Sequence, residues 1–125
     1  MIVGIGVDIA ETVRFEKLYG RYGDRFVRRI LNDKEQKDFA RRRNPVSFLA
    51  TRFAAKEAAS KALGTGFNEE VNYKSIEISN DTDGKPVLRF LHRTSALASK
   101  KNINSIFISI SDESHYAVAM VILEN

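Results

Sequence analysis

The fold is decided by the stretch R-F-A-A-K-E-A-A-S-K-A-L-G-T-G, Arg52 to Gly66, which has the composition of a long, alanine-rich helix. Just upstream, Asn44 and Pro45 form a helix start, with Asn at the N-cap and Pro at the first helical position. No helix breaker follows until Gly64. The sequence therefore predicts a central helix of roughly twenty residues, about 30 Å long.

One face of this helix carries small apolar side chains at helical spacing. They are Ala55, Ala58, Ala59, Ala62 and Leu63. This spacing predicts a stripe that faces the core. Because these side chains are small, another element can approach the helix closely.

The rest of the chain consists of predicted strands and shorter helices. Residues 2–9 alternate as a strand, and predicted helices cover 11–19, 24–31, 33–42 (capped at Asn32 or Asp33) and 94–101. Two hairpins are predicted, with strands 75–79 and 86–90 around D-T-D-G-K and strands 105–111 and 116–123 around D-E-S-H. This order predicts an α+β fold, in which helices with a long central member pack on an antiparallel sheet. Because there are no repeats or linkers, we expect a single domain over residues 1–125.

Composition excludes several classes of site. The chain has no cysteine, which rules out disulfides, thiolate metal sites and cysteine nucleophiles and fits a reducing compartment. The apolar N-terminus lacks a basic leader and meets a carboxylate at Asp8, unlike a signal peptide or a membrane span. We therefore expect a cytoplasmic protein that does not span a membrane.

Positive charge is concentrated in one region. Residues 14–43 contain eleven Lys or Arg against five Asp or Glu, although the whole chain has a net charge of only +4. Such a basic region predicts a polyanionic partner, which can be nucleic acid, a membrane surface or an acidic protein.

The strand at 2–9 has two dissimilar faces. One carries Val3, Ile5, Val7 and Ile9, and the other carries Gly4, Gly6 and Asp8. A face without side chains beside a carboxylate suits either a bulky ligand or a closely packed helix. Asp8 itself either belongs to a ligand site or caps the helix that begins near Glu11.

Glu57 and Lys61 are four residues apart in the central helix, so they share one face. They form either an exposed ion pair or part of a site. Mg²⁺ prefers oxygen ligands and is usually held by one or two carboxylates, with phosphates and waters as its other ligands. Asp8 and Glu57 can supply that pair, while Lys61 and Arg52 can bind phosphate and offset the charge that grows during phosphoryl transfer.

Four motifs cover nearly the whole chain. They are G-I-G-V-D-I-A-E-T-V-R-F at Gly4 to Phe15, R-F-A-A-K-E-A-A-S-K-A-L-G-T-G at Arg52 to Gly66, N-D-T-D-G-K-P at Asn80 to Pro86, and S-I-S-D-E-S-H-Y-A-V-A at Ser109 to Ala119. In these motifs the sequence closely resembles the holo-acyl-carrier-protein synthases, small bacterial 4′-phosphopantetheinyl transferases.

The resemblance implies that phosphopantetheine is transferred from coenzyme A to a serine of apo acyl carrier protein, for fatty acid biosynthesis, leaving adenosine 3′,5′-bisphosphate. It implies that Asp8 and Glu57 bind magnesium and that Lys61 contacts the pyrophosphate, so these three residues are the expected catalytic set. The general base stays open between Glu57 and a metal-bound water. Coenzyme A contacts are expected at Arg52, Lys61, Gly64 and Pro86, in a homotrimer with active sites between subunits.

The resemblance also gives the basic region a partner, because acyl carrier proteins are strongly acidic. The arginines expected to dock the carrier are Arg14, Arg21, Arg25 and Arg28. Any of them can instead be part of a solvated face, and Arg41 to Arg43 are expected to be surface charge.

One position departs from the family pattern. Many members carry histidine directly after the S-I-S strand, where this chain has Asp112, a residue that would repel a phosphate. His115, three residues later, is the candidate replacement as a coenzyme A contact, or else a surface residue.

A nucleic-acid-binding module is the alternative from a different class. The sequence pI is about 9.5, and the aromatics Phe15, Tyr19, Tyr22 and Phe26 are interleaved with arginines. Their spacing of 4, 3 and 4 suits a core stripe better than a platform for stacking bases. A magnesium-dependent phosphohydrolase would share the metal site but transfer the phosphoryl group to water.

Overall fold

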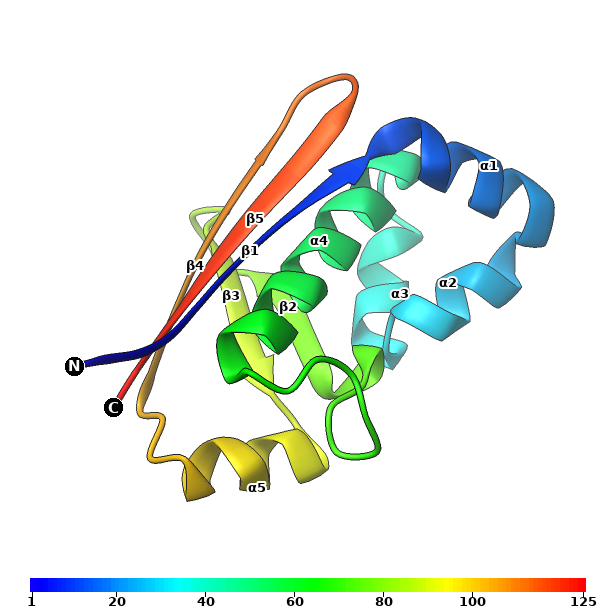
Figure 1. Ribbon diagram of the computed structural model, residues 1–125. Helices are drawn as coiled ribbons and strands as arrows, with labels where there is room; N and C mark the ends of the chain where they lie inside the picture. Colours follow the sequence, from blue (N-terminus) through cyan, green and yellow to red (C-terminus); the bar gives the residue numbers. More distant parts are fainter.

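The computed structural model describes residues 1–125 and arranges them in layers (Figure 1). An antiparallel sheet lies on one side, the long helix α4 (Pro45–Leu63) packs across its face, and three short helices cover the other side of α4. The predicted α+β class is therefore confirmed. The remaining helices are α1 (Thr12–Tyr22), α2 (Asp24–Ile30), α3 (Asp33–Phe39), the 3₁₀ helix η1 (Tyr73–Ser75) and α5 (His92–Lys100).

The strands form two antiparallel sheets. The larger sheet has the order β1-β5-β4, and the smaller one is the β2–β3 hairpin. Their bounds are β1 (Ile2–Glu11), β2 (Ile76–Asn80), β3 (Pro86–Phe90), β4 (Ser105–Asp112) and β5 (Tyr116–Glu124). Both termini lie at one end of the larger sheet (Figure 1). None of the helices is long and apolar enough to cross a membrane.

Helix α4 begins and ends where the local sequence predicts. The side chain of Asn44 accepts a hydrogen bond from the backbone N–H of Ser47 at 3.1 Å, which caps the helix, and Pro45 is its first residue. Gly64 ends the helix with φ at 80°, a left-handed conformation that glycine adopts without strain. The predicted stripe from Ala55 to Leu63 is buried.

The glycine face of β1 packs directly on α4. A Cβ atom on Gly6 would lie 2.0 Å from the carbonyl oxygen of Ala58, and one on Gly4 would lie 2.0 Å from that of Ala62. Of the two interpretations left open for this face, the closely packed helix is therefore correct for Gly4 and Gly6. The small side chains of α4 and the glycines of β1 together allow this contact.

The other face of β1 is uncovered. Val7 and Ile9 expose 56% and 63% of their surfaces, and Met120 on β5 and Phe107 on β4 are also exposed. The sheet is therefore apolar on both sides, although helices cover only one. Contiguous apolar surfaces of this kind are typical of interaction sites.

Some helix ends differ from the prediction because tertiary contacts and caps decide them. α1 continues through Gly20 to Tyr22, and α3 ends at Phe39 instead of residue 42. Asn32, one of the two predicted caps, accepts a hydrogen bond from the backbone N–H of Glu35, whose carboxylate accepts from the backbone of Asn32. This capping box fixes the start of α3.

Candidate functional site

Asp8 and Lys61 meet where β1 runs along α4. The Nζ atom of Lys61 donates to Oδ1 of Asp8 at 3.0 Å and to the carbonyl oxygen of Val7 at 3.1 Å. The side chain of Asp8 is 16% exposed and that of Lys61 is 51% exposed, so the pair lies at the surface. Asp8 therefore does not serve as the cap of α1, whose N-cap residue is Glu11. The carboxylate and the ammonium form one side of a solvent-accessible site.

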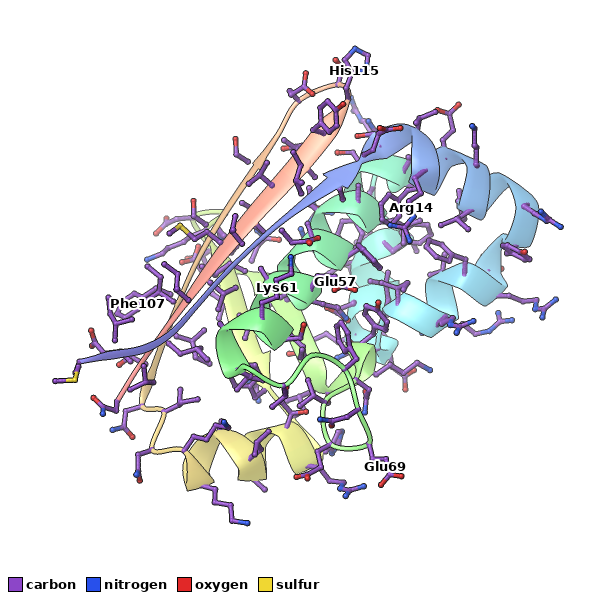
Figure 2. All side chains as sticks on the ribbon, viewed as in Figure 1. Arg14, Glu57, Lys61, Glu69, Phe107 and His115 are labelled. Atoms are coloured by element: carbon purple, nitrogen blue, oxygen red, sulfur yellow. The ribbon has the colours of Figure 1, made fainter.

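Glu57 lies on α4, one helical turn before Lys61 (Figure 2). Its Oε1 atom accepts a hydrogen bond from the hydroxyl of Tyr73 at 2.8 Å. Burial raises the pKa of Tyr73, and the hydrogen bond and negative charge of Glu57 add to this shift. The phenol is therefore a neutral donor that holds the Glu57 carboxylate.

The donor set at this site fits magnesium. Asp8 and Glu57 offer only oxygen ligands, which a hard cation prefers. No group of three or more His, Asp or Glu side chains is placed to hold a metal ion by itself. A cation bound by this pair would take its remaining ligands from phosphate or water, as Mg²⁺ usually does.

Lys56 and Lys61 have different environments despite belonging to the same helix. Lys56 is fully buried, and its Nζ atom donates to Glu35 at 2.6 Å, to the Ile30 carbonyl at 2.7 Å and to the Tyr73 carbonyl at 2.7 Å. Burial lowers the pKa of Lys56, and the Glu35 carboxylate opposes that shift. Lys56 therefore has a structural role, because its hydrogen bonds join α4 to α2, α3 and η1.

Arg52 lines a different groove from the one beside Asp8. Its guanidinium donates to Oδ1 of Asn80 at 2.7 Å and stacks over the ring of Phe48 at 4.2 Å. Burial and the positive charge of Arg42 lower the pKa of Arg52 to about 10. Because it precedes Glu57 by five residues, it points about 140° away around the helix, at 3.6 residues per turn.

The groove around Arg52 has a volume of about 410 Å³. Residues from three separate sequence motifs line this groove: Arg52 of α4, Pro86 of the β2–β3 hairpin and Asp112 of β4. Asp112 accepts a hydrogen bond from the hydroxyl of Ser47 at 2.9 Å. The groove is strongly basic because Arg42 and Arg43 line it beside Arg52.

Gly64 and His115 lie apart from this groove. Gly64 follows the last residue of α4, three positions after Lys61. His115 is exposed at the tip of the β4–β5 hairpin (Figure 2), where its carbonyl oxygen accepts from the backbone N–H of Thr12 at 2.8 Å. Within one chain, the expected coenzyme A contacts are therefore distributed over several surfaces.

The predicted docking arginines lie at the surface of α1 and α2. Arg14 and Arg25 line a groove of about 440 Å³ that also contains Arg29 and the side chains of Phe53 and Tyr73. Arg14 lies 5.3 Å from the centre of the Phe53 ring. Arg21 and Arg28 are exposed but do not line this groove.

The aromatic residues among these arginines belong mainly to the core. Phe15 is fully buried, and Tyr19 and Phe26 pack against the core cluster. Only Tyr22 is exposed, at 43%. A platform for stacking bases needs exposed rings, so this arrangement does not support the nucleic-acid alternative.

Sequence reasoning missed Tyr73 and Arg29, and it treated Arg42 and Arg43, which line the groove around Arg52, as surface charge. Tyr73 follows a loop after Gly66, and no motif or periodicity connects it with Glu57. Arg29 was detectable, because it follows Arg25 by four residues and therefore shares its helix face.

The chain is similar to known proteins in both sequence and structure. A model of the 4′-phosphopantetheinyl transferase superfamily matches residues 4–121. The chain is 53% identical over 124 residues to the holo-[acyl-carrier-protein] synthase of Vibrio cholerae, covering 99% of this chain and 98% of that protein. The holo-[acyl-carrier-protein] synthase of Neisseria meningitidis is similar in structure, with a TM-score of 0.96, 38% identity and complete coverage of both chains. The Bacillus anthracis synthase in complex with CoA (3′,5′-ADP) has a TM-score of 0.83 at 41% identity, covering 98% and 96% of the two chains.

Proposed function

The chain belongs to the 4′-phosphopantetheinyl transferase superfamily, among its holo-[acyl-carrier-protein] synthases, and we propose a specific reaction for it. Phosphopantetheine passes from coenzyme A to a serine of apo acyl carrier protein in a magnesium-dependent step that releases adenosine 3′,5′-bisphosphate. The observation that carries this proposal is the contact of Asp8 with Lys61 where β1 meets α4, with Glu57 one helical turn before Lys61. The product supports fatty acid biosynthesis, and the cytoplasmic location stays a prediction.

Each of the three residues has a distinct role in this proposal. Asp8 and Glu57 hold magnesium, which when bound offsets negative charge on the pyrophosphate of coenzyme A. Lys61 leaves Asp8 to contact the β-phosphate, where negative charge grows as the carrier serine attacks and the bisphosphate departs. The exposed position of Lys61 gives its side chain the freedom that this change of partner requires.

The basic groove around Arg52 is proposed to bind the nucleotide end of coenzyme A. Arg52 and Pro86 line it together, and its three arginines suit a phosphate. Asp112 lies in the same groove and accepts from Ser47, so a ligand phosphate must contact the arginine side of the groove. Roles for Gly64 and His115 in binding coenzyme A stay predictions.

A homotrimer is proposed because one chain keeps the two halves of the site on different faces. Arg52 lines one groove, whereas Asp8 and Lys61 pair at another surface. The uncovered apolar face of the β1-β5-β4 sheet offers a surface for subunit contact. Assembly through this face would bring the groove of one subunit near the carboxylates of the next.

The acidic acyl carrier protein is proposed to dock on α1 and α2. Arg14 and Arg25 line the groove beside Tyr73, the residue that donates to Glu57, so a carrier bound there would lie close to the transfer site. Charge complementarity over an exposed basic surface speeds association and favours acidic partners. Arg21 and Arg28 extend the same charged surface.

The experiment that tests this function is intact-mass analysis of apo acyl carrier protein incubated with this protein, coenzyme A and Mg²⁺. We expect the carrier to gain the mass of one phosphopantetheine group, and we expect no gain with EDTA or with folded Asp8→Asn and Glu57→Gln variants. Release of free phosphopantetheine and adenosine 3′,5′-bisphosphate from coenzyme A, without a change in carrier mass, would instead indicate a phosphohydrolase. An unmodified carrier with wild-type protein and magnesium would contradict the proposed transfer.

A further inference from the structure

Tyr73 is held at both of its ends by consecutive residues of α4. Its backbone carbonyl accepts from the buried ammonium of Lys56 at 2.7 Å, and its hydroxyl donates to Oε1 of Glu57 at 2.8 Å. Lys56 is itself fixed by Glu35 and by the carbonyl oxygen of Ile30. The 3₁₀ helix that contains Tyr73 therefore cannot shift along α4 without breaking a buried ion pair or its neighbouring bonds.

The ring of Tyr73 is fixed as well. It stacks on Phe67 with a centroid distance of 4.2 Å and on Phe53 at 5.7 Å, with interplanar angles of 28° and 23°. A ring held between two others keeps its hydroxyl in one place. The hydrogen bond to Glu57 therefore comes from a donor that is positioned independently of the carboxylate.

We propose that Tyr73 is a positioning residue that orients the Glu57 carboxylate for magnesium, an inference that rests on the proposed metal role of Glu57. The hydroxyl donates to Oε1, and no hydrogen bond from another side chain or the backbone reaches Oε2. Fixing the carboxylate in advance removes the loss of side-chain freedom that would otherwise accompany metal binding. Hydrogen bonds to metal-binding carboxylates act in this way at other sites, and their loss weakens metal affinity.

A purely structural role for Tyr73 makes a different prediction. If its hydroxyl only satisfies a half-buried polar group, removing it changes stability and leaves metal affinity unaltered. Tyr73→Phe separates the two roles, because it removes one oxygen atom and keeps the ring between Phe53 and Phe67. Tyr19→Phe is the matched control, since Tyr19 also packs against an aromatic ring, Phe39, and makes no contact with Glu57.

The test is calorimetric titration of Mn²⁺, as a probe of the magnesium site, into the full-length protein with coenzyme A and without carrier. We expect Tyr73→Phe to raise the Kd for Mn²⁺ about 10-fold. In the transfer assay, the Mg²⁺ concentration for half-maximal rate should rise in the same proportion, while the rate at saturating Mg²⁺ stays within about 2-fold. Tyr19→Phe should match wild type in both measurements.

Glu57→Gln, measured in the same titration, distinguishes failure of the positioning role of Tyr73 from failure of the metal role of Glu57. If Glu57→Gln loses Mn²⁺ binding while Tyr73→Phe binds as wild type does, the positioning role is overturned and the metal site stands. If Glu57→Gln binds Mn²⁺ as wild type does, the metal role of Glu57 is wrong, and the proposal for Tyr73 is overturned with it.

Discussion

The ammonium of Lys61 lies 3.0 Å from the carboxylate of Asp8, although the two residues are 53 positions apart in the sequence. Lys61 therefore occupies the position where a cation would bind Asp8. This contact predicts opposite effects on metal affinity and on catalysis when Lys61 is neutralised.

Lys61→Met should tighten Mn²⁺ binding in the absence of coenzyme A by about 5-fold, since removing a charge at 4 Å in water changes the energy by about 1 kcal/mol. The same change should lower the transfer rate about 100-fold, because the growing charge on the phosphate loses its partner. Calorimetry and the intact-mass assay measure the two effects. Lys100→Met, an exposed lysine of α5, is the control, and weaker Mn²⁺ binding by Lys61→Met would contradict the interpretation of the pair.

Gly6→Ala should lower the free energy of unfolding by about 3 kcal/mol, because the added methyl group would overlap the backbone of α4. The nearest atom, the carbonyl oxygen of Ala58, lies 2.0 Å from the position of that methyl group. Urea unfolding measures the change. Gly20→Ala is the control: no atom lies within 4 Å of its Cβ position, and Ala in a helix should add about 0.5–1 kcal/mol. Equal stabilities for Gly6→Ala and wild type would contradict the close contact.

Lys56→Met should lower the free energy of unfolding by about 3–5 kcal/mol, because it leaves the Glu35 carboxylate buried without its partner. The double variant Lys56→Met with Glu35→Leu should recover part of this loss, since it removes the unpaired charge. Full recovery is not expected, because Glu35 also accepts from the backbone N–H of Ile78 at 2.8 Å. Lys34→Met, whose side chain is 57% exposed, should change stability by less than about 0.5 kcal/mol.

Arg14→Ala combined with Arg25→Ala should raise KM for the carrier about 10-fold. Each arginine is expected to form one exposed ion pair with the acidic carrier, and losing two pairs of about 0.7 kcal/mol each weakens binding by that factor. The rate at saturating carrier should stay nearly unchanged, because these residues are proposed only to dock the partner. The difference in KM should shrink as salt is added. Arg21→Ala with Arg28→Ala should have a smaller effect, since neither residue lines the groove, and an equal effect would place docking outside it.

Val7→Lys should convert the proposed trimer into monomers, because it places a charge on the uncovered apolar face of the sheet, in the edge strand β1. Light scattering coupled to size-exclusion chromatography measures the molecular mass, and circular dichroism confirms the fold. The matched control is Val13→Lys, an exposed apolar residue of α1 outside this face. A wild-type protein that is already monomeric would contradict assembly through the sheet.

The sequence by itself determined the central helix, the α+β class and the family, because these follow from local signals. Asn44, Pro45 and Gly64 act on the backbone within one or two turns, so they fix the ends of α4 without help from distant residues. The same holds for the pairing of Glu57 with Lys61 on one face, which the helix period requires. The motif around Asp8 then predicted a partner for them on β1.

Only the tertiary structure decided which side of each element is covered. The alternation in β1 predicted two different faces, but it did not predict which face packs on α4. The glycine face does so and the apolar face stays exposed, because the contact depends on the shape of the opposing helix. Likewise, Lys56 and Lys61 look alike in sequence, but five residues place them about 140° apart around the helix. Lys56 therefore pairs with the buried Glu35, whereas Lys61 pairs with Asp8. Both partners lie more than 20 positions away in the sequence, so no local signal predicts either pair. The contact of Tyr73 with Glu57 has the same origin, since the loop that brings them together carries no local signal for it.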